Sequence, residues 1–281
     1  MNNLILVGDI GSTKSSWWLS GKEPKEINLP GFNPIVHELE TGVNLVASLK
    51  NELKENFPHS IWYYGAGIID DQSKQIVREL FKKEFPGSQL IVHSDLVGAA
   101  IATCGRDAGT VAILGTGSHA AVFDGQKIIR QANSLGYILG DEGGGSDIGK
   151  SLIQSYFYNI MPQSVRLEMD KLLPKGRPGF LNDLFSSPYP NQFLATFAQL
   201  AVSMKDDAWI RELISSKFRL FLKYHLIPLA PVEPVHFLGS IGCIFADLIE
   251  NELNVYSLKA GMFLQNPSAR LFTMHLNHGF E

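Results

Sequence analysis

Residues 4–19, LILVGDIGSTKSSWWL, contain the pattern that decides the fold. Residues 4–8 form a short apolar run, residues 9–14 form a turn rich in Gly, Ser and Thr, and an apolar run resumes over residues 15–19. Apolar runs of this length on both sides of a turn are typical of two short strands. The stretch therefore predicts a strand, a turn and a second strand.

The region that follows alternates between helical and strand-like patterns. Apolar spacing predicts a helix over residues 41–57 and another over 70–85, whose first turn Asp70 can cap. Residues 61–65 and 89–93 have the composition of strands. Because strands and helices alternate, we expect a mostly parallel α/β sheet.

Residues 110–123 repeat the opening pattern. An apolar run over 110–114 is followed by the turn at 115–118 and by a second apolar run over 120–123. Aligning Gly11-Ser12 with Gly117-Ser118 gives an offset of 106 residues. The repeat favours two related halves.

The second half is richer in helical patterns than the first. With 281 residues, the chain is long enough for two domains, which we expect over 1–104 and 105–281. We predict helices over 146–160, 192–204 and 206–226, a linker marked by Pro228, Pro231 and Pro234, a strand over 235–238, and then a helix to Glu250.

Composition excludes several classes of protein. Hydrophobic residues make up 45% and charged residues 19%, and the net charge is −4, which argues against disorder and against binding to nucleic acid or an anionic membrane. Cys104 and Cys243 lack the spacing of a zinc or redox motif, so we expect a reducing, cytoplasmic compartment. We expect no signal peptide, and no transmembrane segment, since residues 96–104 are far shorter than the ~20 residues needed to span a bilayer.

Three turns after apolar strands, at 11–13, 115–118 and 239–242, suit phosphate binding. Glycine lets the backbone approach an anion closely, and hydroxyl groups add donors without bulk. Each turn also fits an ordinary hairpin or strand–helix connection. The first is not a Walker loop, because Thr13 precedes Lys14, and no segment has the GxGxxG pattern of a nicotinamide-binding protein.

Carboxylates accompany these turns. Asp9 could hold Mg²⁺ or cap its turn, and Asp95 could act in catalysis or as a helix N-cap. Residues 139–145 place Asp141 and Glu142 in a segment too rich in glycine to pack as core, for which the alternative is a flexible, solvated loop. We expect His275 and His278 to face solvent rather than to bind metal.

Taken in order, five motifs resemble the N-acetylglucosamine kinase-like branch of the BadF/BadG/BcrA/BcrD ATPase family. These motifs are Asp9-Ile-Gly11-Ser12-Thr13-Lys14, Asp95 with the alanines behind it, Leu114-Gly-Thr-Gly-Ser118, Gly136-Tyr-Ile-Leu-Gly-Asp-Glu-Gly143 and Leu238-Gly-Ser-Ile-Gly242. The resemblance implies the actin-like, hexokinase and Hsp70-type ATPase fold. In that fold two ribonuclease-H-like α/β domains, here with a helix-rich second domain, bind ATP and Mg²⁺ in the cleft between them.

The resemblance also implies a role for each matching residue. Asp9 would organise Mg²⁺, and Asp95 would be the general base. Asn33, which a simple turn at Asn33-Pro34 would also explain, and Asp141 would hold the sugar. The phosphate turns would be Gly11, Ser12, Thr13 and Lys14 and then Thr116, Gly117 and Ser118, and the turn beside the adenosine would be Gly239, Ser240 and Gly242. His119 stands where many members carry a sugar-contacting Asn, so it bears on which sugar is bound.

The resemblance predicts an ATP- and Mg²⁺-dependent kinase that phosphorylates an amino sugar, foremost N-acetylglucosamine at its 6-hydroxyl. Glucosamine, N-acetylmannosamine and N-acetylmuramic acid stay open as substrates. Two other functions are an ATPase activator of a 2-hydroxyacyl-CoA dehydratase, which needs clustered thiolates, and a non-catalytic sugar sensor. The resemblance further implies a homodimer with a small-molecule substrate.

Overall fold

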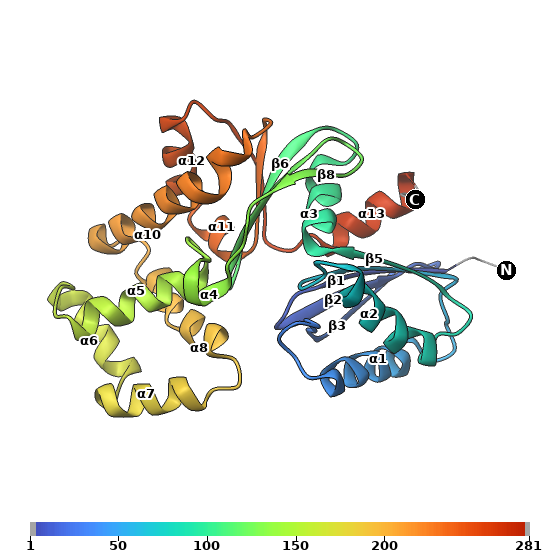
Figure 1. Cartoon of the computed structure of the whole chain (residues 1–281), viewed down its shortest axis with the longest axis horizontal. Coiled ribbons are helices and arrows are strands. Elements are labelled where there is room, and N and C mark those ends of the chain that lie inside the picture. The colour runs from blue at the N-terminus through green and yellow to red at the C-terminus, as the bar shows by residue number, and fades with distance from the viewer. Residues whose placement is uncertain (1–3, 279–281) are drawn as a thin grey trace. The chain divides into compact units, whose positions relative to one another are not determined.

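The computed structural model describes residues 4–278 and divides into two compact units (Figure 1). The first unit comprises the described residues up to Arg106 together with those from Asn266 onward, and the second comprises Asp107–Gln265. We expected residues 105–281 to form the second domain, but the last helix, α13 (Ser268–His278), belongs to the first unit. Its buried Phe272 stacks on Trp18 there, with the ring centroids 5.7 Å apart.

The first unit is built on a five-stranded sheet in the order β3-β2-β1-β4-β5. The strands are β1 (Ile5–Ile10), β2 (Lys14–Leu19), β3 (Lys25–Pro30), β4 (Ser60–Gly65) and β5 (Gln89–Ser94). Strands β1, β4 and β5 are parallel, whereas β2 and β3 form antiparallel hairpins with them. Sequence alone did not predict β3.

Two helices cover each face of this sheet (Figure 1). Helices α1 (Leu39–Leu53) and α2 (Asp71–Glu84) pack on the face that carries Trp17 and Tyr63, and α2 begins at the predicted cap Asp70. Helices α3 (Asp95–Cys104) and α13 pack on the other face, where Trp18 and Tyr64 point. Because side chains alternate along a strand, neighbouring residues of β2 and β4 enter opposite cores.

The second unit repeats this sheet in the order β10-β9-β6-β7-β8. The strands are β6 (Gly109–Leu114), β7 (Ser118–Phe123), β8 (Ile128–Gln131), β9 (Val235–Leu238) and β10 (Ala260–Leu264). Strands β6, β9 and β10 are parallel, and β7 and β8 are antiparallel, as in the first sheet. The two halves therefore share one strand order and one pattern of directions.

The structural repeat has an offset of 104 residues, not the 106 that we predicted. Strand β1 begins at residue 5 and β6 at residue 109, and β2 begins at residue 14 and β7 at residue 118. Gly11 therefore corresponds to Gly115, and Lys14 corresponds to Ser118. The sequence alignment failed because it matched Gly-Ser pairs, whereas the strand ends set the register.

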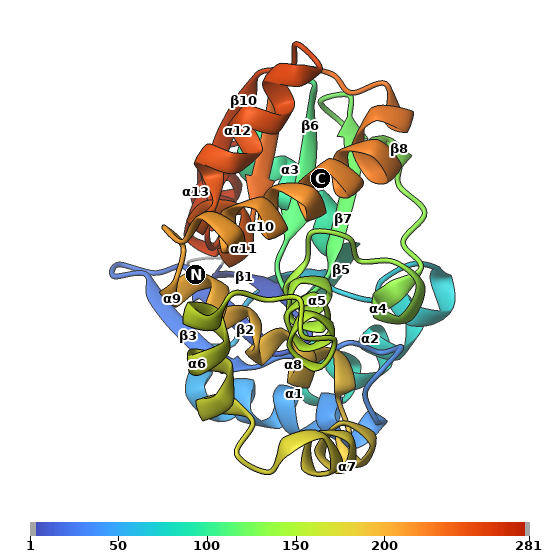
Figure 2. The ribbon, with the colours of Figure 1, turned by 90° about the vertical axis from the view of Figure 1, so that its left-hand side faces the viewer.

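Helices fill the interval between β8 and β9. They are α4 (Gly136–Leu139), α5 (Gly145–Phe157), α6 (Gln163–Leu172), α7 (Gly176–Ser186), α8 (Pro190–Thr196), α9 (Ala198–Ser203) and α10 (Ala208–Phe221). The helix predicted over 192–204 is interrupted at Phe197, and α10 continues as a π-helical turn, η1 (Leu222–Leu226). The short helix α11 (Ser240–Ile244) precedes α12 (Ala246–Val255), and α10 and α12 lie on one face of the second sheet (Figure 2).

None of the helices in residues 4–278 is long and apolar enough to cross a bilayer.

The proline-rich segment before β9 is not a linker, contrary to our prediction. Residues Ile227–Leu229 form a 3₁₀ turn. Thr110 then holds the following residues, since its hydroxyl donates to the Val232 carbonyl at 2.8 Å and its amide donates to the Pro234 carbonyl at 3.2 Å. These bonds attach the segment to β6 inside the second unit.

Candidate functional site

The first turn joins β1 to β2 and is closed by a hydrogen bond from the Gly11 amide to the Lys14 carbonyl at 2.9 Å. Gly31 packs directly on it, because a Cβ at Gly31 would lie 2.1 Å from the Gly11 carbonyl oxygen. The Phe32 amide also donates to that oxygen at 3.1 Å. The turn predicted to bind phosphate is therefore fixed on one side by the loop that carries Asn33.

Asp9 and Asp95 lie close enough to affect each other's charge. Burial, followed by the negative charge of Asp95, raises the pKa of Asp9 from 3.8 to about 7, and Lys14 opposes this rise. Asp9 is the next-to-last residue of β1, and Asp95 directly follows β5, so parallel strands bring both carboxylates to one edge of the sheet. A cation bound between the two carboxylates would relieve their repulsion and stabilise their charged forms.

Asp95 is not the N-cap of α3. The cap is Ser94, whose hydroxyl accepts a hydrogen bond from the Val97 amide at 3.4 Å. Asp95 is the first residue of the helix, and its Oδ1 accepts from the Leu96 amide at 2.8 Å. Since Ser94 provides the cap, the capping role does not account for a carboxylate at position 95.

Asn33 lies over the end of β4 and against the first turn. Its Nδ2 donates to the Ser12 hydroxyl at 3.0 Å, and its Oδ1 accepts from the Ile35 amide at 3.0 Å. Gly67, with φ +75°, leaves room for it, because a Cβ there would lie 2.0 Å from Asn33 Oδ1. The loop that follows β4 and the Asn33 side chain therefore meet beside the first turn.

Tyr63 is a residue near this site that sequence reasoning missed. Its side chain is fully buried, and its hydroxyl has no hydrogen-bond partner among residues 4–278. Burial, with a further contribution from the Asp95 charge, raises the pKa of Tyr63 above its ordinary range. The phenol is thus a neutral donor near Asp95, and the apolar pattern of β4 gave no signal for it.

In the second unit, the turn between β6 and β7 packs against the glycine-rich segment that we expected to stay out of the core. The amides of Gly145 and Ser146 donate to the carbonyls of Gly115 and Thr116, each at 2.8 Å. A Cβ at Gly144 would lie 2.7 Å from the Gly117 carbonyl carbon. Residues 143–145 are buried, so glycine serves close packing here rather than flexibility.

Asp141 contacts the second turn. Its Oδ1 accepts from the Ser118 amide at 3.5 Å, and a Cβ at Gly117 would lie 2.7 Å from its Oδ2. Burial is the main influence that raises the pKa of Asp141, while the Ser118 hydrogen bond opposes it. The residue has φ +62°, an uncommon conformation for a side chain other than glycine.

The third turn also meets the second. Gly239 has φ +98°, and a Cβ there would lie 2.4 Å from the Leu114 carbonyl oxygen. Gly242 faces the Leu114 side chain, and Ser240 begins α11. The predicted turns of the second unit therefore converge at the carboxyl ends of the adjacent strands β6 and β9.

His119 lies on β7 and is half-buried. Its Nε2 is 3.0 Å from the Ala132 carbonyl oxygen, so this nitrogen is the donor. Its charge also affects Asp141, which places the two side chains in one neighbourhood.

Two polar pairs of the second unit were not predicted. His225 Nε2 lies 2.6 Å from Glu142 Oε2, and Lys217 Nζ lies 3.4 Å from the buried Asp147 Oδ1. Residues 217 and 225 are far from 142–147 in sequence, so only the tertiary fold brings them together.

His275 is buried, contrary to our prediction that it faces solvent. Its Nε2 lies 2.8 Å from the Tyr64 hydroxyl, and burial, with the His93 charge, lowers its pKa to about 4. The side chain of His278 lies outside the described residues. Cys104 is buried in the first unit, and Cys243 is partly exposed in the second.

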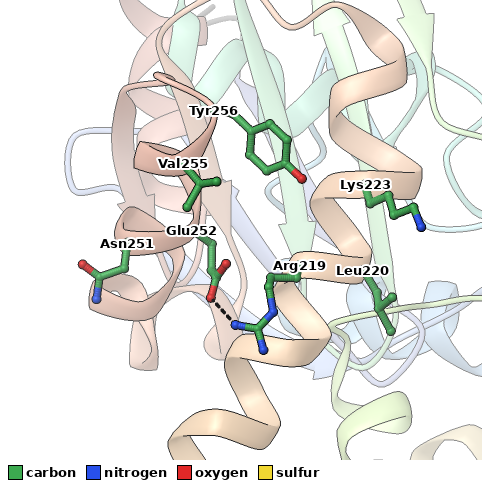
Figure 3. A pocket seen from close by; sticks show the side chains of 7 residues that line it. All are labelled: Arg219, Leu220, Lys223, Asn251, Glu252, Val255 and Tyr256. Carbon is green, nitrogen blue, oxygen red and sulfur yellow. Dashed lines mark hydrogen bonds and ion pairs between the residues drawn. The ribbon is translucent and has the colours of Figure 1, made fainter.

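A cavity of about 500 Å³ lies between α10 with η1 and α12. Figure 3 shows its lining and the ion pair of Arg219 with Glu252, which are 3.0 Å apart. The lining residues are Arg219, Leu220, Lys223, Asn251, Glu252, Val255 and Tyr256, and they include none of the predicted site residues.

The residues present fit a nucleotide phosphate and a magnesium ion. The hydroxyls of Ser118 and Ser146 are buried without a hydrogen-bond partner in the described part of the chain, so an anion would satisfy donors at the second turn. Asp9 and Asp95 suit Mg²⁺, which often binds through one or two carboxylates and the phosphates of its substrate. No group of three or more His, Cys, Asp or Glu side chains that could hold a metal occurs within residues 4–278.

Comparison with known proteins identifies the fold. No protein-family profile matches the sequence, and no curated protein matches it. Among solved structures, the chain is similar to a putative N-acetylglucosamine kinase from Porphyromonas gingivalis, with 28% identity, a TM-score of 0.90, and coverage of 98% of this chain and 99% of that one. A putative N-acetylglucosamine kinase from Chromobacterium violaceum has 16% identity and a TM-score of 0.71, with coverage of 97% and 98%.

A ROK family glucokinase from Streptomyces griseus, solved with glucose and AMPPNP, shares 14% identity and has a TM-score of 0.52, with coverage of 96% and 97%. Together with the duplicated sheet, these similarities give the chain the actin-like ATPase fold, which confirms the predicted fold class.

Proposed function

We propose that this protein is an ATP- and Mg²⁺-dependent kinase that phosphorylates an amino sugar, with N-acetylglucosamine and its 6-hydroxyl as the preferred substrate. The observation that carries the proposal is the pair of carboxylates, Asp9 and Asp95, at the strand ends beside the first turn. The similarity to the P. gingivalis protein over 98% of the chain supports it.

In this proposal Asp95 accepts the proton of the sugar hydroxyl as that oxygen attacks the γ-phosphorus. Asp95 is the first residue of α3, at the end of the helix where the helix dipole is favourable to negatively charged groups. The bond from the γ-phosphorus to the bridging oxygen breaks, and ADP leaves. Positioning and charge neutralisation supply most of the rate enhancement in reactions of this class.

Asp9 would hold the magnesium ion, which supplies positive charge to the phosphates when bound. Ionised Asp9 is the form that binds a cation, and Lys14 favours that form. Gly11, Ser12, Thr13 and Lys14 would bind the terminal phosphates: Ser12, Thr13 and Lys14 would donate to them, and Gly11, whose amide closes the turn, would let the backbone approach closely. Thr116, Gly117 and Ser118 would bind phosphate in the second unit, with Gly239, Ser240 and Gly242 beside the adenosine.

Asn33, Asp141 and His119 would contact the sugar. Asn33 is held by Ser12 and Ile35, so its amide is fixed before a ligand binds. Asp141 would accept hydrogen bonds from sugar hydroxyls, since a carboxylate is an acceptor at both oxygens. These roles make the sugar site depend on a few oriented polar groups rather than on net charge.

A panel of sugars tests the proposed function. ADP release with Mg-ATP is measured with N-acetylglucosamine, glucosamine, N-acetylmannosamine, N-acetylmuramic acid and no sugar. We expect ADP release to require a sugar and to be faster with N-acetylglucosamine than with the other sugars. Release that is independent of every sugar would indicate an ATPase, and the absence of ADP release would contradict the kinase.

A further inference from the structure

One face of α10 and η1 holds the glycine-rich segment of residues 140–147 at three places. Lys217 Nζ is 3.4 Å from Asp147 Oδ1, and Asp147 Oδ2 accepts from the Gly143 amide at 3.2 Å. A Cβ at Gly143 would lie 3.2 Å from Phe221 Cβ. His225 Nε2 is 2.6 Å from Glu142 Oε2, and only 7% of the His225 side chain is exposed.

The π-helical turn explains why Lys217, Phe221 and His225, each four residues apart, lie on the same face of the helix. A four-residue step overshoots a full α-helical turn by about 40°. From Phe221 to His225 the chain passes through η1, where the wider turn, closed by i to i+5 hydrogen bonds, counteracts that overshoot. His225 therefore points back toward the segment that Lys217 and Phe221 contact.

These contacts fix the backbone that directly follows Asp141. The residue has φ +62°, and this left-handed conformation persists for a side chain other than glycine only where its neighbours enforce it. Glu142, the next residue, is fixed by His225, and Gly143, with φ +79°, is fixed by Asp147 and Phe221. The backbone after Asp141 thus has little freedom, and the Asp141 carboxylate stays on the Ser118 amide.

We propose that His225 is a positioning residue for the sugar site: through Glu142 it holds Asp141 in the conformation that binds sugar hydroxyls. The inference rests on the proposed function, because that function assigns the sugar contact to Asp141. In this proposal His225 acts through Glu142 and contacts neither the sugar nor ATP. Its loss is expected to weaken sugar binding and transfer while the first turn keeps its geometry.

The opposite face of the same helix provides a matched control. Arg219, Leu220 and Lys223 line the cavity between α10 and α12 rather than the segment at 140–147 (Figure 3). Lys223 lies in η1, two residues before His225, and its side chain is exposed. A Lys223→Ala variant therefore alters the π-helical turn without removing a contact to Glu142.

The test compares His225→Ala, His225→Gln and Lys223→Ala in the full chain. We expect His225→Ala to raise KM for the sugar about tenfold or more, since a small misplacement of a binding group is costly, and to leave KM for ATP near the wild-type value. His225→Gln, which can donate to Glu142, should recover most of the loss. Lys223→Ala should match the wild type.

Amide hydrogen exchange gives a readout that does not need sugar turnover. His225→Ala is expected to speed exchange in residues 140–147 but not in residues 9–14, and Glu142→Ala should do the same if His225→Ala does not fold. Unchanged exchange in 140–147, or equal changes in KM for the sugar and for ATP, would overturn the positioning role. If the wild-type protein phosphorylated no sugar, the proposed function would be contradicted. Hydrogen exchange in residues 140–147 would still decide whether His225 positions Asp141.

Discussion

The first turn of the first unit and its counterpart in the second have the same strand geometry but different chemistry. Gly11 corresponds to Gly115 and Lys14 to Ser118, yet the position of Asp9 in β1 is occupied by Ile113 in β6. The first turn has two carboxylates and a lysine near it, whereas the second has hydroxyls, amides and a carboxylate contributed by a separate segment.

This difference shows that two copies of one sheet can differ in chemistry through the residues at their strand ends and through the segments that pack against those ends. Both copies offer a glycine-containing turn after a parallel strand, which suits phosphate. Only the first copy carries a carboxylate within its β1-type strand, so a cation is expected there. In the second copy, glycines at 143–145 let α5 approach the turn closely.

Asp95→Asn should have the largest effect, because it removes the proposed base of the first unit. We expect turnover with sugar to fall by at least about 10²-fold, with nucleotide affinity near the wild-type value. Ser94→Ala is the matched control, since it removes the N-cap of α3 but leaves the carboxylate. If Ser94→Ala lost as much turnover as Asp95→Asn, helix stability rather than proton transfer would explain position 95.

Gly117→Val should weaken ATP binding at the second turn, and it should weaken sugar binding as well, because the new side chain would displace the Asp141 carboxylate. A side chain at position 117 is obstructed by a close contact and not by a positive φ, because a Cβ there would lie 2.7 Å from Asp141 Oδ2. A Cβ at Gly115 would meet nothing within 4 Å. Gly115→Ala is therefore the control in the same turn. Calorimetric titration with ATP measures both variants, and equal affinities would place the phosphates elsewhere.

Asp9→Asn should separate stability from function. Folded Asp9 keeps its proton up to about pH 7, and the ordinary pKa is 3.8, so the folded state binds more protons between these values. The free energy of unfolding therefore contains a contribution that falls as pH rises from about 4 to about 7.

The stability of the Asn variant should not fall over this pH range, and the variant should be about 1–3 kcal/mol more stable than the wild type at pH 8. Each pKa unit corresponds to 1.36 kcal/mol, and the partial exposure of the Asp9 side chain to solvent screens part of this energy. It should also require far more Mg²⁺ for turnover. Chemical denaturation at pH 5 and pH 8 checks the first expectation, and a Mg²⁺ titration checks the second. Parallel pH profiles for the two proteins would contradict the burial of Asp9.

His119→Asn should have the smallest effect of these variants. Because the imidazole donates to the Ala132 carbonyl and lies near Asp141, we expect the ranking of sugars by kcat/KM to change by about 5-fold or more, on the scale of one lost polar contact. KM for ATP should move less. An unchanged ranking in a folded variant would leave sugar selection to Asn33, Asp141 and the surrounding loops.

The strands at both turns could be predicted because their apolar runs and glycine turns are local signals. The same holds for α2, where Asp70 caps the helix as predicted. The register of the repeat could not be predicted, because the single Gly-Ser pair of each turn stands at a different distance from the end of the preceding strand. His275 was misjudged because its burial depends on α13 returning to the first unit, a contact between residues 64 and 275.

Parts of the candidate site depend on such long-range contacts. The proximity of Asp9 to Asp95 follows from strand order, which the alternation of strands and helices indicates. The contact of His225 with Glu142 depends on the π-helical turn. The apolar spacing of residues 206–226 does not distinguish a helix with such a turn from a continuous α-helix. The burial of residues 143–145 was missed because a glycine-rich run looks like a loop until its packing partner is known.

The most direct test of the central claim is the mass of the sugar after incubation with Mg-ATP. N-acetylglucosamine and its 6-deoxy analogue are each incubated with the wild type and with Asp95→Asn, and the products are read by mass spectrometry. We expect one added phosphoryl group on N-acetylglucosamine with the wild type, none on the 6-deoxy analogue, and at least about 10²-fold less product with Asp95→Asn. Phosphorylation of the 6-deoxy analogue, or full product with Asp95→Asn, would contradict transfer to the 6-hydroxyl with Asp95 as the base.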